Sequence, residues 1–131
     1  MRAIAVIIII LGLASLVFGI LFTTQSVSAR QEVADSIAPL TLDELDAKYD
    51  AVKEKQTAMK MAEEPGIQAG QAQPSATYNY LTIQKTGLGL ARANVGTADA
   101  IMMYGLIDII VGLGLVLTGI GMLRKLQGEA T

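Results

Sequence analysis

The chain of 131 residues contains no cysteine and no histidine. Disulfide bonds, thiolate or imidazole metal ligands, and catalytic systems built on a Cys or His nucleophile are therefore excluded. A surplus of positive charge is also missing, because 10 basic and 12 acidic residues leave a net charge of -2. Such a chain lacks the basic footprint of a nucleic-acid-binding protein, so we expect no nucleic-acid partner.

Two long apolar runs lie near the ends of the chain and contain almost no charge. Residues 3–22 have no charged side chain, and residues 101–123 have one. A helix rises about 1.5 Å per residue, so each run is long enough to cross about 30 Å of hydrocarbon. The segment between them holds nearly all the acidic residues. This pattern predicts two membrane-spanning helices joined by one water-exposed segment.

The first run has an alternative interpretation as a signal peptide. Arg2 precedes it, and small residues at 27–29 resemble a cleavage site before Arg30. The apolar run of about 20 residues exceeds the roughly 7–15 residues typical of the apolar core of a signal peptide. The sequence therefore favours an uncleaved anchor. The alternative is an envelope protein whose N-terminal segment is removed, and in both cases the middle segment leaves the cytoplasm.

The flanks of the two runs predict their orientation. Arg2 precedes the first run, and Arg124 and Lys125 follow the second. Positive residues collect on the cytoplasmic side of a membrane, and long loops count little toward this bias. We therefore predict a multi-pass protein of the plasma or inner membrane, with both termini in the cytoplasm and the central segment outside.

The central segment contains the signals of two helices. Thr41 and Glu44 are spaced as a capping box, in which each satisfies a free backbone amide at a helix N-terminus. The Pro-Gly pair that begins at Pro65 is expected to end this helix. After a tip loop at 65–75, a second helix is expected to begin near Ala76.

Apolar residues recur on both predicted helices at alternating spacings of three and four, which is typical of a coiled-coil seam. When the helices are folded against each other about Gly70, bulky Tyr49 faces small Ala91. Gln56 and Gln84 fall at the same level, and a buried polar pair of this kind fixes the register of a coiled coil. The seam positions are Leu42, Leu45, Tyr49, Val52, Gln56 and Met59 on the first helix and Leu81, Gln84, Leu88, Ala91, Val95 and Ala98 on the second.

Small residues recur every seven positions in both apolar runs, and the period predicts one long helix over 81–123. Lipid gives helices little hydrophobic reason to associate, so close approach of small-residue faces supplies the packing energy. A seven-residue period predicts a left-handed crossing of small angle. The predicted helix-packing interface consists of Ala5, Gly12, Ser15 and Gly19 in the first run and Gly105, Asp108, Gly112 and Gly119 in the second.

Asp108 is the one charged residue within the two apolar runs. It lies between Gly105 and Gly112, so it borders the glycine face and does not point into lipid. An unpaired carboxylate near mid-membrane costs on the order of 2.5–3.5 kcal/mol, which favours a partner or protonation. Ser15 is the nearest candidate donor, and no lysine or arginine lies at this depth. A structural role and an ion-translocating role both remain open.

The predicted fold is an all-α membrane protein, in which two transmembrane helices form a hairpin with an extracytoplasmic antiparallel helical stalk. The expected segments are an N-terminal transmembrane helix (1–22), a connector (23–40), the stalk (41–100), a second transmembrane helix (101–123) and a short cytoplasmic tail (124–131).

The sequence contains no catalytic constellation, cofactor motif or metal-ligand spacing, so we expect neither an enzyme nor a cofactor. We expect a small integral membrane subunit that packs through glycine-rich helix faces, as an accessory component of a larger complex or as a homo-oligomer. Its partners would be the lipid bilayer and other membrane subunits or further copies of itself. The alternatives are an oligomeric pore or ion-translocating unit that uses Asp108, and the cleaved envelope protein.

Overall fold

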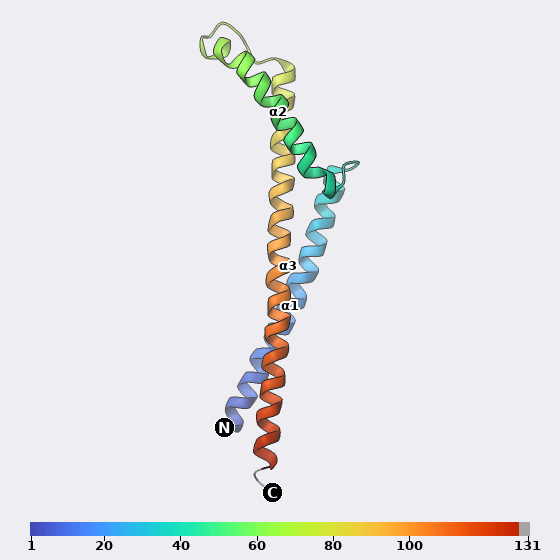
Figure 1. The fold of residues 1–131 in the computed structure, drawn as a ribbon, viewed down its shortest axis with the longest axis vertical. Coiled ribbons are helices and arrows are strands. Elements are labelled where there is room, and N and C mark those ends of the chain that lie inside the picture. Colours follow the sequence, from blue (N-terminus) through green and yellow to red (C-terminus); the bar gives the residue numbers. More distant parts are fainter. Residues whose placement is uncertain (129–131) are drawn as a thin grey trace. The chain divides into compact units, whose positions relative to one another are not determined.

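The computed structural model describes residues 1–128, and within them the chain forms three helices and no strand (Figure 1). They are α1 (Arg2–Ile37), α2 (Leu42–Gln68) and α3 (Ala76–Gly128). Both α1 and α3 are long and apolar enough to cross a membrane. The all-helical class, the two candidate spans and the helix start at Ala76 are therefore confirmed. The end of the predicted tail, residues 129–131, lies outside the described residues.

The chain divides into two compact units. Unit 1 contains residues 1–29 and 97–128, and unit 2 contains residues 30–96. Both α1 and α3 contribute to each unit as continuous helices, whereas α2 lies wholly within unit 2. Most of the segment 23–40, expected as a connector, continues α1 without a break.

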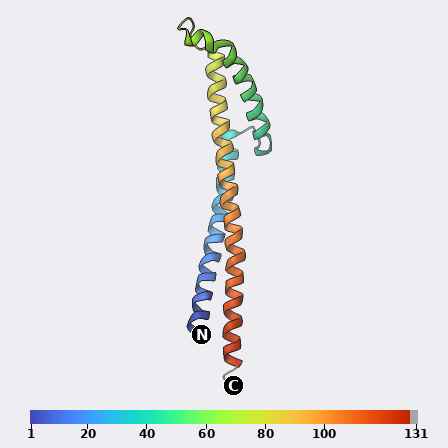
Figure 2. The ribbon, with the colours of Figure 1, turned by 60° about the vertical axis from the view of Figure 1, so that its left-hand side comes forward.

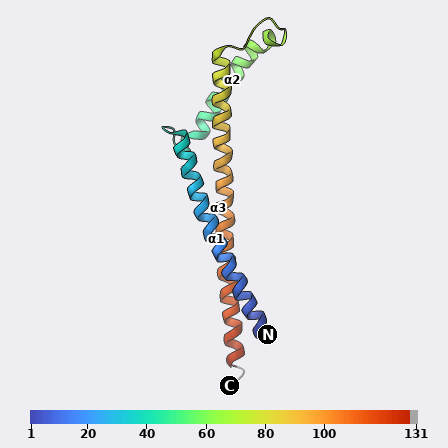
Figure 3. The ribbon, with the colours of Figure 1, turned by 180° about the vertical axis from the view of Figure 1, so that it is seen from behind.

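In unit 1, α1 runs antiparallel to α3, and Figure 3 shows it passing across the face of α3. The buried positions are small and recur every seven residues on each helix. Large apolar side chains lie on the outside; Ile110 is 70% exposed and Leu117 is 69% exposed. The buried positions are Ala5, Gly12, Gly19 and Ser26 on α1 and Ala98, Gly105, Gly112 and Gly119 on α3.

In unit 2, α2 folds back beside the first part of α3 (Figure 2), and the last part of α1 packs against both. Val33 of α1, Leu45 of α2 and Ala91 of α3 form the buried cluster at their meeting point. Each of the three helices therefore contributes one apolar residue to this cluster. The partly buried residues around the cluster are Ile37, Leu40, Leu42, Leu88 and Val95.

The prediction that Pro65 ends α2 is wrong. The helix continues to Gln68, and Gly70, which follows the C-cap residue Ala69, has a φ of 68°. The amide of Gly70 donates to the carbonyl of Ile67 (3.0 Å), and the amide of Gln71 donates to the carbonyl of Gly66 (2.9 Å). This pair of bonds is a Schellman motif, which closes a helix on a left-handed glycine. Proline removes only one amide donor, whereas this motif satisfies the carbonyls at the helix end.

The start of α2 is held by Glu44. Its Oε2 accepts hydrogen bonds from the amide of Thr41 (3.1 Å) and from the Thr41 hydroxyl (2.8 Å). These two bonds, the hydroxyl bond first, lower the pKa of the Glu44 carboxyl below its usual value. The predicted contact from Glu44 back to the Thr41 amide is therefore confirmed.

A second carboxylate joins the end of α2 to the start of α3. Glu63 accepts hydrogen bonds from the Ser75 hydroxyl (2.6 Å) and the Ser75 amide (2.9 Å). The same hydroxyl accepts a hydrogen bond from the amide of Tyr78 (3.0 Å), so Ser75 also caps the N-terminus of α3. The hydroxyl bond, followed by the amide bond, lowers the pKa of Glu63.

Candidate functional site

The candidate site is the contact between the small-residue faces of α1 and α3 in unit 1. A Cβ atom added at Gly112 would lie 2.7 Å from the carbonyl oxygen of Gly12 and 2.8 Å from the amide nitrogen of Leu16. One added at Gly19 would lie 2.6 Å from the carbonyl oxygen of Gly105. Real Cβ atoms essentially never come closer than 3.0 Å to such atoms. At this separation of the two backbones, these positions accept only glycine.

The antiparallel arrangement determines which small residues meet. Gly12 meets Gly112, and Gly19 meets Gly105. A Cβ added at Gly119 would lie 2.9 Å from the carbonyl oxygen of Ala5, which is 0% exposed. The structure therefore brings the six small residues of the predicted interface together as three pairs.

Two serines of α1 bond to the backbone of α3. The Ser15 hydroxyl donates to the carbonyl oxygen of Asp108 at 2.9 Å. The fully buried Ser26 hydroxyl donates to the carbonyl oxygen of Ala98 at 2.6 Å. The sequence-based prediction missed Ser26, although Ser26 continues the seven-residue series after Gly19. That spacing is the signal that would have identified it.

Asp108 lies half-buried at the edge of this contact. Ser15, the predicted donor, bonds to the main-chain carbonyl of Asp108 and not to its carboxylate. Within residues 1–128, the carboxylate has no hydrogen-bond or ion-pair partner. The carboxylate of Asp108, the one charged group within the two apolar runs, therefore has no partner on α1.

Gln56 and Gln84, which were predicted to set the register of α2 against α3, do not hydrogen-bond to each other. Gln56 is buried, and its Oε1 accepts a hydrogen bond from Nζ of Lys85 at 3.2 Å. Gln84 is half-buried and, with Ile37 of α1, lines a hollow. The two amides therefore belong to different contacts within unit 2.

The reason for this difference is the extension of α1. Val33 of α1 packs at Ala91, a position of α3 that the predicted seam assigned to α2. Residues of α2 therefore contact the neighbouring positions of α3. Arg92 of α3 forms an ion pair with Asp46 (2.7 Å) and lies 5.4 Å from the ring centre of Tyr49.

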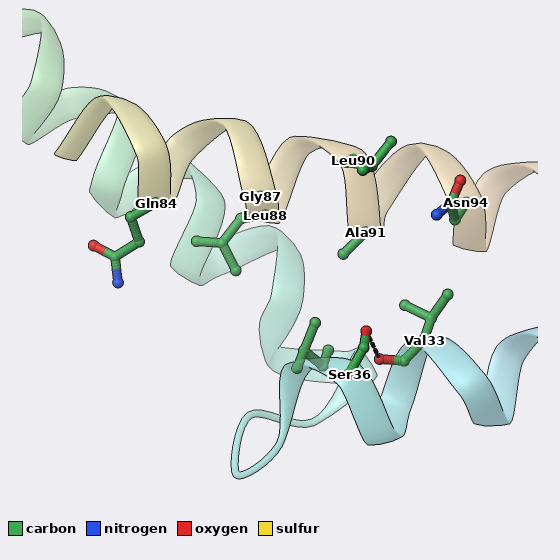
Figure 4. A pocket seen from close by; sticks show the side chains of 9 residues that line it. Val33, Ser36, Gln84, Gly87, Leu88, Leu90, Ala91 and Asn94 are labelled. Carbon is green, nitrogen blue, oxygen red and sulfur yellow. Dashed lines mark hydrogen bonds between the residues drawn. The ribbon is translucent and has the colours of Figure 1, made fainter. Parts of the chain in front are cut away.

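The hollow in unit 2 lies between α1 and α3 (Figure 4). Gln84, Leu88 and Ala91 point toward α1, whereas Leu90 points away from it. None of the lining residues has a charged side chain, and the hydroxyl of Ser36 donates to the carbonyl oxygen of Val33 at 2.7 Å. Among residues 1–128, no group of three or more Asp, Glu, Cys or His side chains could hold a metal ion.

Comparisons with known proteins give no further guide to the function. No family model matches the chain, and no curated protein and no solved structure was found to be similar to it. The function is therefore inferred from the geometry.

Proposed function

We propose that this protein is a non-catalytic integral membrane subunit whose two apolar helices cross the bilayer as a hairpin. The observation that carries the proposal is the distribution of side chains in unit 1. Glycine, alanine and serine fill its interior, while isoleucine, leucine, valine and phenylalanine lie outside. In water this would expose a large contiguous apolar surface, which soluble proteins avoid. Lipid tails cover such a surface without penalty.

The packing within unit 1 also suits a lipid environment. Helices in lipid gain little by burying apolar surface, so they associate through close backbone approach and hydrogen bonds. The glycine pairs provide the close approach, and Ser15 and Ser26 provide hydrogen bonds to the facing backbone. Each such bond contributes about 0.6 kcal/mol on average in membrane proteins.

The proposed topology places both termini in the cytoplasm and most of unit 2 outside. The positive residues at 2, 124 and 125 support this orientation. The contacts of α1 support an uncleaved first helix. Cleavage after residue 29 would remove Gly12 and Gly19 and leave the facing glycines of α3 without a packing partner.

An accessory role within a larger membrane complex, or within a homo-oligomer, follows from what the described residues offer. They provide packed helix faces and an outer three-helix unit. The second candidate is an oligomeric ion-translocating unit. The unpaired carboxylate of Asp108 favours it, because ionisable groups inside membranes often mark ion pathways.

We test the topology with single cysteines in the naturally cysteine-free chain. Gln73 in the tip loop and Gln127 near the end of α3 are both exposed. An impermeant maleimide added to intact cells is expected to label Gln73→Cys, and to label Gln127→Cys only after the cells are opened. Labelling of Gln127→Cys in intact cells, or of neither variant before lysis, would overturn the hairpin. Gln73 is preferred to Ser75 as a probe site because Ser75 is bonded to Glu63.

The second candidate is tested in liposomes that contain a pH-sensitive dye. The accessory role predicts no proton flux above that of empty liposomes. Flux that the wild-type chain supports and that Asp108→Asn abolishes, with assembly intact, would replace the accessory role by ion translocation.

A further inference from the structure

A second face of α3 is exposed in both units except at Asp108, which is half-buried at the edge of the contact with α1. It consists of Tyr80, Ile83 and Leu90 in unit 2 and of Tyr104, Asp108 and Val111 in unit 1. Their positions in the sequence share one heptad phase, with steps of three, four or multiples of seven. This phase differs from that of the small residues that contact α1.

In unit 2, the second face is open, and it contains Asn94 beside three large side chains that are mostly exposed. Tyr80 is 64% exposed, Ile83 is 72% exposed and Leu90 is 63% exposed. Neighbouring positions of α3 make contacts within the unit, because Ala91 packs with α1 and Arg92 pairs with α2. Apolar side chains at coiled-coil spacing on the free side of a helix are typical of a helix–helix interface.

In unit 1, the second face carries the unpaired carboxylate of Asp108. Tyr104 is 65% exposed and Val111 is 48% exposed on the same face. Beside them, a Cβ added at Gly114 or Gly121 would meet nothing within 4 Å. Another helix can therefore approach α3 closely here and supply a hydrogen-bonding group for Asp108.

We infer that the second face of α3 binds the same face of a second copy of this chain, side by side and pointing in the same direction. The inference rests on the proposed function, because it requires both copies to enter the membrane in the same orientation. The two Asp108 carboxyls then lie at the same depth. Each carboxyl is then within reach of the other as a hydrogen-bond partner.

Two features favour a second copy over a different protein. A copy always places its carboxyl at the depth of Asp108, whereas another protein would need a donor positioned there independently. The second face and its flank also carry no charged side chain other than Asp108 between residues 79 and 121. Asp108 is therefore the one position of this face at which like charges would meet in a parallel pair, and a two-fold axis lets both copies use one interface.

The test uses two matched cysteine variants in liposomes. Val111 and Leu113 are 48% and 50% exposed, and they lie on opposite sides of α3, about 200° apart on a helix. On oxidation, Val111→Cys is expected to become largely disulfide-linked dimer, while Leu113→Cys stays at the background of random encounters. Equal cross-linking of both variants, or more at Leu113→Cys, would overturn the inference.

Changes at Asp108 in the Val111→Cys background test the carboxyl pair. Asp108→Asn is expected to keep the cross-link, because amides pair as donor and acceptor. Asp108→Leu is expected to lose most of it. Unchanged cross-linking of Asp108→Leu would overturn the carboxyl pair, and circular dichroism shows whether that variant keeps its helices.

The labelling of Gln73→Cys and Gln127→Cys separates this inference from the proposed function. Correct sidedness without cross-linking at Val111→Cys overturns the second copy and leaves the membrane hairpin standing. Copurification of a different protein would then identify the occupant of the face. Wrong sidedness overturns both proposals.

Discussion

Gly112 and Gly114 lie two residues apart on α3, yet their surroundings differ. A Cβ added at Gly112 would lie 2.7 Å from the carbonyl of Gly12, whereas one at Gly114 meets nothing within 4 Å. Replacing glycine by alanine inside a helix gains about 1 kcal/mol from backbone entropy. Overpacking a close contact costs about 1–3 kcal/mol. Whether alanine stabilises or destabilises the chain therefore depends on which side of α3 the glycine lies.

We predict that Gly112→Ala destabilises the monomer by on the order of 1 kcal/mol, which is the packing cost minus the helix gain. Gly114→Ala is expected to leave stability unchanged or to raise it. Unfolding in mixed detergent micelles, at concentrations where the chain is monomeric, measures both. Equal stability of the two variants would contradict the close contact between α1 and α3.

Glu63 predicts a dependence on pH. Its hydrogen bonds to Ser75 lower its pKa in the folded chain below the ordinary value of 4.5. The contact therefore stabilises the fold above pH 4.5, and this contribution is lost as the pH falls through the lowered value. The protection factor of the Ser75 amide against hydrogen exchange is expected to fall in acid.

Glu63→Gln is expected to remove this acid sensitivity, because the amide does not titrate. Glu54→Gln, a change of an exposed acid on the same helix, is the control and is expected to keep it. Acid sensitivity that survives in Glu63→Gln would assign the effect to another group.

At the scale of the elements, the end of α2 depends on one glycine more than on a proline. Gly70 has a φ of 68°, where a residue with a side chain costs about 1–2 kcal/mol. Gly66 lies within α2, and a Cβ added there would lie at an ordinary contact distance of 3.5 Å from Ala72. Gly70→Ala is therefore expected to lower the melting temperature, and Gly66→Ala to raise it or leave it unchanged. Shifts in the same direction would argue against the left-handed cap.

Local signals in the sequence were sufficient to predict where α2 and α3 begin. The spacing of Thr41 and Glu44 marks a helix start, and the turn-rich linker marks the start near Ala76. They were not sufficient for the end of α2. Pro65 predicts an earlier end than the structure has, because the hydrogen bonds of Gly70 and Gln71 close the helix.

The course of α1 beyond its apolar run could not be predicted from the sequence in the same way. Residues 23–37 have mixed polarity, so neither their composition nor a local signal distinguishes a helix along α3 from a connector. Their contacts with α3 are tertiary, with Ser26 bonded to Ala98 and Val33 packed against Ala91. The same contacts account for the difference between the predicted and the observed contacts of α2 with α3.

At the scale of the whole molecule, the period of seven identifies the small residues, but it does not say which group of Asp108 receives a hydrogen bond. The carbonyl and carboxylate of one residue are only a few ångströms apart. The choice between them depends on the distance between the helices, which the glycines determine. Sequence spacing carries no information of that kind. The free carboxylate, on which the proposed dimer depends, is therefore visible only in the structure.

The contacts between helices also join residues at steadily increasing sequence separations. Ser75 and Glu63 are 12 residues apart and Lys85 and Gln56 are 29 apart, whereas Ser15 and Asp108 are 93 apart. Loop closure loses more entropy as the loop lengthens, and each contact near the tip shortens the loop left for the next. Contacts near the turn at Gly70 can therefore form first, and contacts progressively further from the turn can follow. On this route the N-terminal residues of α1 are the last to find their partners on α3.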